Sequence, residues 1–193
     1  MRPIELITML GVLGCSATFC AEATSGRDSF LKSLREHCEA REGAAHAALS
    51  EEQEIQRDLM ISLPTMKPIC GPQSQRFGRV KSKKDGHIEH LGIDIRTKAG
   101  KKVVAAGAGK VLSVGCAKPE AQGKRHDDCN QIVVTHGNGL ITIYSGYAKA
   151  LAKPSQIVCR DEAVAESAEG DLHFEVRVND VPVDPMTYIL ETF

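Results

Sequence analysis

The sequence predicts a mainly β protein, with an antiparallel sheet or sandwich core and an N-terminal helical arm. From Phe77 onward, short β-type runs alternate with glycine and polar turn signals, and no helical pattern intervenes. Such a succession of short strands favours an antiparallel, all-β core. Before residue 63, in contrast, helix-forming residues dominate. The two parts of the chain therefore belong to different structural units.

The first 23 residues have the features of a secretory signal peptide. Arg2 precedes an apolar run over residues 6–14, and Ala21-Glu22-Ala23 fits a small-residue cleavage site. The competing interpretation is an uncleaved anchor helix, for which the run is short. In a further alternative, Val12-Leu13-Gly14-Cys15 is a lipobox, so Cys15 would carry a lipid and hold the chain on a membrane. Both the cleaved and the lipidated form would be exported.

The cysteines agree with export, because seven in one chain suit an oxidising compartment. Cleavage after Ala23 would leave five of them, whereas lipidation of Cys15 would leave six others that could all pair. One candidate bridge joins Cys38 to Cys70, and a second joins Cys116 to Cys129 across the base of a hairpin. The sequence alone does not fix the pairing.

The helical arm is predicted over residues 24–62. Its apolar residues form two groups with helical spacing, and Gly43 between them predicts either two helices or one bent helix. The arm is either packed on the following domain or serves as a spacer, partner-binding or inhibitory segment. Residues 63–76 contain Pro64, Pro68 and Pro72, which exclude a helix and predict a linker.

The remaining domain is predicted over residues 77–193. Its strands are expected at residues 91–95, 102–105, 109–114, 131–135, 140–144 and 172–178. Gly137-Asn138-Gly139 predicts a tight hairpin between two of them. The 24 basic and 25 acidic residues nearly cancel, which gives no support for a nucleic-acid partner bound by bulk electrostatics.

Two short motifs carry the candidate chemistry. The first is His90-Leu91-Gly92-Ile93-Asp94, and the second is Asp171-Leu172-His173-Phe174-Glu175. Two imidazoles and one carboxylate suit a zinc site with three protein ligands and one open position. In an extended strand, Asp171, His173 and Glu175 would share one face, which lets Glu175 orient a ligand histidine.

These motifs and their surroundings resemble the lysostaphin/LytM-type zinc endopeptidases, which cut peptide cross-links in bacterial cell wall. The resemblance runs from about Phe77 to the C-terminus and includes residues 103–111, 136–139 and 182–185. It implies a lysostaphin/LytM-type fold, a Zn²⁺ ion held by His90, Asp94 and His173, and a place in the periplasm or cell envelope of a bacterium. The alternative is a triad that persists without binding an ion.

The chain departs from the family pattern at two positions that should hold catalytic histidines, which are Gly146 and Asp171. Asp171 could act as a general base, but an ionised carboxylate cannot donate a hydrogen bond to an oxyanion. Tyr144 and His136 are the other candidates for a catalytic role, and the alternative is that both serve packing or a turn.

The resemblance therefore implies a zinc-dependent metalloendopeptidase-like protein with weak or altered activity on peptidoglycan cross-links. The alternative function is a catalytically inactive member that binds wall peptides or regulates another cell-wall hydrolase. The segment from Arg160 to Gly170 is acidic where the family has a loop that shapes the substrate site. This difference predicts an altered placement of the substrate.

Overall fold

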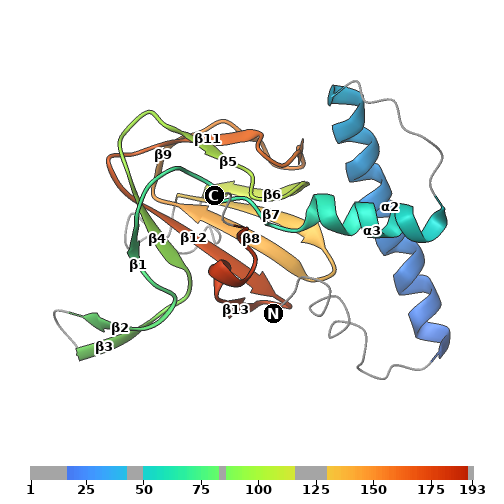
Figure 1. The fold of residues 1–193 in the computed structure, drawn as a ribbon, viewed down its shortest axis with the longest axis horizontal. Coiled ribbons are helices and arrows are strands. Elements are labelled where there is room, and N and C mark those ends of the chain that lie inside the picture. The colour runs from blue at the N-terminus through green and yellow to red at the C-terminus, as the bar shows by residue number, and fades with distance from the viewer. Residues whose placement is uncertain (1–16, 43–49, 83–85, 116–129, 191–193) are drawn as a thin grey trace.

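The computed structural model describes residues 17–42, 50–82, 86–115 and 130–190 (Figure 1). The predicted lipobox with Cys15 and the predicted Cys116–Cys129 bridge lie outside these ranges. Helix α2, Ala17–Glu42, runs across the predicted cleavage site at Ala23, and the signal peptide stays a prediction. Among the described residues, no helix combines the length and the apolar run that crossing a bilayer requires.

The N-terminal arm consists of two helices, α2 and α3, the latter at Glu51–Ser62. Ser50 caps α3 in a capping box with Gln53, which satisfies backbone groups that the first helical turn leaves unpaired. Arg35 of α2 forms an ion pair with Asp58 of α3, with 3.2 Å between Nε and Oδ1. These contacts hold the two helices against each other.

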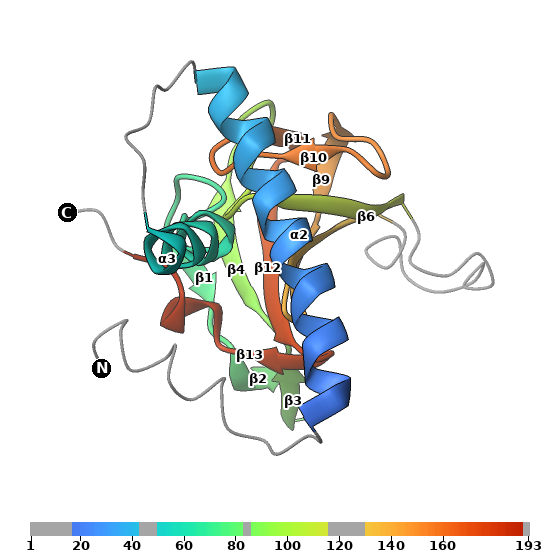
Figure 2. The same ribbon diagram turned by 90° about the vertical axis from the view of Figure 1, so that its right-hand side faces the viewer.

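Helix α2 is fastened to the β domain by a covalent and an ionic link. Figure 2 shows α2 lying along the side of the sheet, where it contacts β7 and β10. Cys38 forms a disulfide with Cys159, which is 121 residues away in the sequence, and Arg41 pairs with Glu162. The predicted Cys38–Cys70 bridge is therefore wrong, and Cys70 is an exposed free thiol. Folding brings the turn at Cys159 to α2, whereas nearness in sequence favoured Cys70.

The main sheet has eight strands, and every neighbouring pair in it is antiparallel. In spatial order the strands are β1 (Gln73–Gln75), β4 (Ile93–Thr97), β12 (Gly170–Val178), β8 (Leu140–Ser145), β7 (Gln131–Gly137), β6 (Gly109–Gly115) and β10 (Ile157–Val158), with β13 (Val181–Val183) paired to β12. All six predicted strands are present with small shifts of their ends. β7 and β8 are joined by Asn138 and Gly139, which have φ values of 54° and 71°. Positive φ at both positions gives the predicted tight hairpin.

Two smaller sheets and a short 3-10 helix complete the domain. One sheet has three strands, β5 (Lys102–Val104), β11 (Ala163–Ser167) and β9 (Tyr147–Ala150), and the other is the hairpin of β2 (Gly78–Ser82) and β3 (Gly86–His90). The 3-10 helix η2 spans Pro185–Thr187. The apolar core packs against one face of the main sheet. On β4 and β12 it includes Ile93, Ile95, Leu172 and Phe174, all fully buried. Strand alternation therefore leaves the residues between them on the opposite face of β4 and β12.

The segment predicted as a linker, residues 63–76, follows the surface of the β domain. Its last part forms β1, the edge strand that pairs with β4. Upstream of β1, backbone groups also pair with the domain: the Val104 N–H donates to the Pro68 carbonyl and the Arg96 N–H to the Pro72 carbonyl. Proline excludes a helix but still offers its carbonyl as an acceptor, so this segment is extended and packed.

Candidate metal centre

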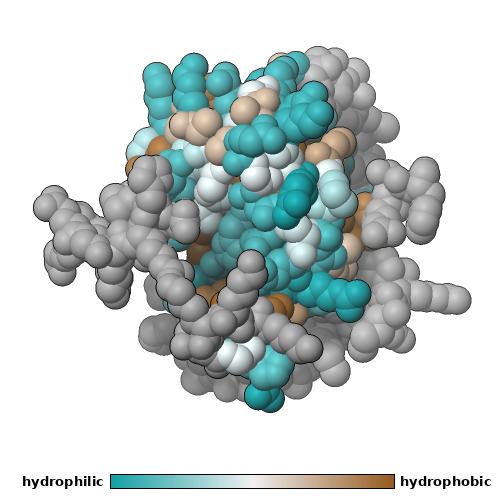
Figure 3. Space-filling view, turned by 90° about the vertical axis from the view of Figure 1, so that its left-hand side faces the viewer, coloured by the Kyte–Doolittle hydropathy of each residue, from teal (hydrophilic) through white to brown (hydrophobic). Residues whose placement is uncertain are grey.

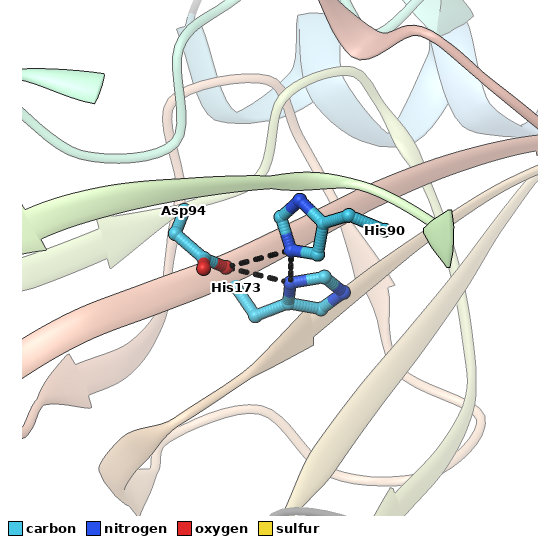
Figure 4. Close-up of side chains that lie close together, drawn as sticks. All are labelled: His90, Asp94 and His173. Atoms are coloured by element: carbon cyan, nitrogen blue, oxygen red, sulfur yellow. Dashed lines mark hydrogen bonds and ion pairs between the residues drawn. The ribbon is translucent and has the colours of Figure 1, made fainter. Parts of the chain in front are cut away.

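The structure brings the three predicted ligands to one point (Figure 4). Asp94 on β4 lies directly opposite His173 on β12 in the antiparallel register, so the two side chains share a face. His90 is the last residue of β3. Its Nε2 lies 3.2 Å from Asp94 Oδ1 and 3.1 Å from His173 Nδ1, and His173 Nδ1 lies 2.8 Å from the same oxygen. Two imidazole nitrogens and one carboxylate oxygen therefore converge.

Gly92 explains how His90 reaches the pair on the neighbouring strands. A Cβ atom at this position would lie 2.3 Å from the carbonyl oxygen of Phe174. Only glycine allows the backbone between β3 and β4 to approach β12 so closely. Leu91 and Gly92 thus join β3 to β4 so closely that the His90 imidazole, from the β2–β3 hairpin, lies over the face of the main sheet.

Hydrogen bonds on the outer side of each imidazole orient the ring. His90 Nδ1 donates to the carbonyl oxygen of Arg76 at 2.6 Å, which leaves Nε2 with its lone pair. His173 Nε2 donates to the carboxylate of Glu175 at 3.1 Å, which leaves Nδ1 of the neutral ring available to a cation. Such outer partners fix the tautomer of a metal-binding histidine. Glu175 was expected in this role from strand alternation.

The electrostatic environment at His173 favours positive charge. Burial alone would lower its pKa, but hydrogen bonds and charge attraction from Asp94 and Glu175 outweigh burial and raise the pKa to about 9. Burial likewise opposes ionisation of Glu175, whereas His173 and Arg177 hold the pKa of that carboxyl below its usual value. Protons and metal ions compete for such nitrogens. The same oxygens that attract a proton here would attract a metal ion.

Zinc fits this donor set. The three ligand atoms lie within 4.8 Å of one another, and they form the group suited to a metal ion among the described residues. Two imidazole nitrogens with one carboxylate oxygen is a ligand combination of catalytic zinc sites, which keep a further position open. The close approach of two nitrogen lone pairs and a carboxylate is unfavourable unless a shared cation or proton lies between them.

Asp171 lies on the same face as His173 but makes different contacts. Its Oδ1 accepts hydrogen bonds from Arg96 Nε at 3.0 Å and from the Ser74 hydroxyl at 2.9 Å. Its Oδ2 lies 3.4 Å from Arg96 Nη2. The hydrogen bond from Arg96 lowers the pKa of the Asp171 carboxyl and outweighs the opposing effect of burial. Asp171 is thus held as an ionised partner of arginine, which is unlike a general base tuned toward neutral pH.

Gly146 follows the end of β8 and has a left-handed backbone. Its φ is +81°, and a Cβ atom there would lie 2.8 Å from the carbonyl oxygen of Asp171. A histidine at this position would be strained both by the backbone angle and by this contact. The backbone geometry at residue 146 therefore favours glycine over histidine.

His136 and Tyr144 lie in the interior, and their polar atoms are occupied. His136 Nδ1 donates to the Ala108 carbonyl at 2.8 Å, and Nε2 lies 2.9 Å from the Thr142 hydroxyl. The Tyr144 hydroxyl accepts from the Ala106 N–H at 2.9 Å, and Thr142 Oγ1 lies 3.1 Å from it. Burial lowers the pKa of His136 to about 4 and raises that of Tyr144 to about 12. This burial favours the packing interpretation over a catalytic role for either residue.

The acidic segment between Arg160 and Gly170 is ordered by its own carboxylates. Glu162 accepts from the Cys159 N–H and pairs with Arg41 of α2. Glu169 accepts from the Ala99 N–H at 3.1 Å. The middle of the segment forms β11. Its negative charge thus supports local structure, an outcome that charge counting alone did not predict.

Sequence reasoning did not identify Arg96 or Ser74 as neighbours of the site. Arg96 is 75 residues from Asp171 in the sequence, and only the β4–β12 register places the two opposite each other. Figure 3 shows the side of the molecule on which β1 and the β2–β3 hairpin lie, where the described surface is mainly hydrophilic with small apolar patches. Ile88 and Leu91, which flank His90 in sequence, are exposed apolar residues.

Comparison with known proteins places these features in a family. Residues 88–185 match the family described as Peptidase family M23. An uncharacterized lipoprotein, YgeR of Escherichia coli, is 31% identical over 103 residues, and the peptidoglycan DD-endopeptidase ShyB of Vibrio cholerae is 34% identical over 106 residues. Each match covers 51% of this chain, but only 38% of YgeR and 23% of ShyB.

A solved structure extends the match to three dimensions. A zinc-containing peptidase from Vibrio cholerae is 28% identical, with a TM-score of 0.53 over 63% of this chain and 38% of that chain. The predicted mainly β fold of the lysostaphin/LytM type, with its N-terminal helical region, is thereby confirmed.

Proposed function

The chain belongs to peptidase family M23, and on this premise we propose that it acts on peptide cross-links of peptidoglycan through a zinc site. The proposed ligands are His90, Asp94 and His173. The observation that carries the proposal is the convergence of their three ligand atoms within 4.8 Å on the solvent-facing side of β4 and β12.

The residues of this chain would prepare the site for the metal. The Arg76 carbonyl and the Glu175 carboxylate hold the outer nitrogens of His90 and His173, so the inner nitrogens face Asp94. Zn²⁺, when bound in such a site, supplies Lewis-acid activation of water and of a peptide carbonyl. The exposed side chains of Ile88 and Leu91 offer apolar contact to a peptide beside the ligands.

Turnover is proposed to be low, because the lysostaphin/LytM pattern has catalytic histidines at the positions that Gly146 and Asp171 occupy here. Loss of one oxyanion donor costs about 100- to 1,000-fold in rate. The Asp171 carboxylate, bound by Arg96 and Ser74, offers no donor in its place. The peptidase would therefore be weak or altered in specificity.

A second candidate function is binding without hydrolysis, and the Arg96–Asp171 pair favours it. The pair replaces a proton-handling group by a hydrogen-bonded ion pair on the same face as the metal ligands. In this case the protein would bind wall peptides or regulate another cell-wall hydrolase. ShyB is a peptidoglycan DD-endopeptidase and YgeR a lipoprotein, and these relatives support a location in the bacterial cell envelope for either candidate function.

One experiment separates the candidates. The zinc-loaded full chain is incubated with purified cell-wall sacculi, and new amino termini and bound protein are measured. Release that is lost in His90→Ala but kept in His87→Ala, an exposed histidine on the same strand, supports the peptidase. Binding without release supports the second candidate. A zinc-loaded, folded protein that neither binds nor cuts sacculi would overturn the proposal.

A further inference from the structure

We propose that Arg96, oriented by Asp171, binds a carboxylate group of the peptide that lies over the three metal ligands. The inference rests on the proposed function and deepens it, because it names a chemical feature of the substrate. It also gives Asp171 a role as a positioning residue for Arg96.

The location of Arg96 follows from the strand register. Arg96 and Asp94 are two residues apart on β4, as are Asp171 and His173 on β12, and each pair of opposite residues is in register. Residues two apart on a strand share a face and are separated by about 7 Å. The Arg96–Asp171 pair therefore lies on the same face as Asp94 and His173, two residues further along both strands.

The guanidinium group of Arg96 is held in place on one side only. Its Nε and Nη2 donate to the two Asp171 oxygens, at 3.0 and 3.4 Å. Ser74 donates to Oδ1 from β1 and so limits movement of that carboxylate. Asp171 on β12 thus receives hydrogen bonds from β4 and from β1, the strand beyond it, and these restrict the position of its carboxylate against the guanidinium.

The rest of the guanidinium is free to bind a ligand. A guanidinium has five N–H groups, and among the described residues the only acceptor for those of Arg96 is Asp171. The side chain is 65% exposed, compared with 38% for Asp171. The remaining N–H groups, including those of Nη1, suit a carboxylate, which arginine binds through two parallel hydrogen bonds.

The Arg96–Asp171 pair can therefore offer a ligand hydrogen-bond donors rather than acceptors. Both oxygens of Asp171 already accept hydrogen bonds, whereas Arg96 has N–H groups to spare. Arg96 and Asp171 cancel in charge, and a divalent cation on the neighbouring ligands would add positive charge. These features favour an anionic group over a cationic one.

The test uses two synthetic forms of a cross-linked stem peptide. One has free carboxyl groups, and the other has carboxamides in their place. Affinities of both for the zinc-loaded full chain are measured by calorimetry. We expect the free acid to bind on the order of tenfold more tightly, the scale of a charge-assisted hydrogen bond. Arg96→Gln should remove this difference. Lys98→Gln, which removes an exposed cation two residues away, should keep it.

Asp171→Asn provides a second variant that tests positioning. It should reduce the ratio of the two affinities while lowering the melting temperature only slightly, a result that a purely structural role would not give. Equal binding of the acid and the amide to the unmodified chain would overturn the inference and leave the proposed function intact. Failure of both peptides to bind would overturn the proposed function, and the inference would fall with it.

Discussion

Two groups of polar side chains lie on opposite faces of the main sheet, and they differ in what their polar atoms contact. On the open face, His90, Asp94 and His173 point inner lone pairs and an oxygen at one another. On the core face, His136 and Tyr144 direct every polar atom to a backbone or hydroxyl partner. Both groups contain residue types that catalyse reactions. Ligand atoms that converge on one point from different strands therefore distinguish a candidate site from a buried hydrogen-bond network.

The strongest test of this difference removes a proposed ligand. Asp94→Ala should abolish stoichiometric zinc binding, because only two imidazoles remain. The metal-free protein should also lose stability near neutral pH, because Asp94 helps to stabilise the protonated ring of His173. Metal content by atomic emission and thermal unfolding report the two effects. Asp180→Asn, which changes an exposed carboxylate in a turn, serves as the control, and retention of zinc by Asp94→Ala would contradict the ligand assignment.

The converse test is made in the core. His136→Ala should lower the free energy of unfolding by about 3 to 4 kcal/mol, because it leaves a cavity and removes the partners of the Ala108 carbonyl and the Thr142 hydroxyl. The zinc affinity of the folded fraction should not change. Denaturant unfolding and zinc titration measure the two quantities. A loss of zinc affinity at unchanged stability would place His136 in the site after all.

Much of this arrangement was visible in the sequence. Alternating apolar residues predicted β4 and β12, and the same alternation predicted that His173 and Glu175 share a face. The two motifs predicted the three residues whose potential ligand atoms converge. The strands that were not predicted have five residues or fewer, which gives little periodic pattern; they are β1, β2, β3, β9, β10, β11 and β13.

Features that depend on long-range contact were not predictable. The Cys38–Cys159 bridge joins residues 121 apart, and Arg96 meets Asp171 only through the strand register. The sequence also could not place Tyr144, because an aromatic residue at the end of a strand fits either face. Its position follows from packing beside Phe174, with 5.3 Å between the ring centres.

The pH dependence of the free energy of unfolding should report the burial of the His136 imidazole. The pKa of His136 is about 4 in the folded chain and 6.5 in the unfolded chain. The unfolded state therefore binds more protons between these values, and stability falls as the pH drops from 6.5 through 4. The loss amounts to about 3 kcal/mol from this residue. Comparison with His136→Gln isolates the contribution, because the variant lacks this titration, and equal slopes in both proteins would contradict the burial argument.

The outer partner of His173 should have an intermediate effect. Glu175→Gln keeps the shape of the side chain but removes the charge that stabilises the ring and pairs with Arg177. Zinc affinity should weaken by about 10- to 100-fold, as for other outer partners of metal-binding histidines. Competition titration with a zinc chelator measures this change. Glu89→Gln, on the exposed face of β3, is the matched control, and equal effects of both variants would exclude a specific role for Glu175.

The smallest effects concern the two positions without imidazoles, and they should differ from each other. Asp171→His removes an exposed ion pair, which contributes little to stability, from a regular strand position. Gly146→His must adopt a left-handed backbone at a cost of about 1 to 2 kcal/mol, with its Cβ directed at the Asp171 carbonyl. Denaturant unfolding of both single variants compares the costs. A smaller loss in Gly146→His than in Asp171→His would mean that the backbone at Gly146 adapts readily to a side chain.

The same two variants bear on turnover. His at position 171 would return a donor to the open face without strain, so Asp171→His should raise the release of amino termini from sacculi. Gly146→His should give less gain, because its imidazole can be placed only if the backbone shifts away from the Asp171 carbonyl. The low turnover proposed here would then be reversible by one substitution at residue 171 but constrained by main-chain geometry at residue 146.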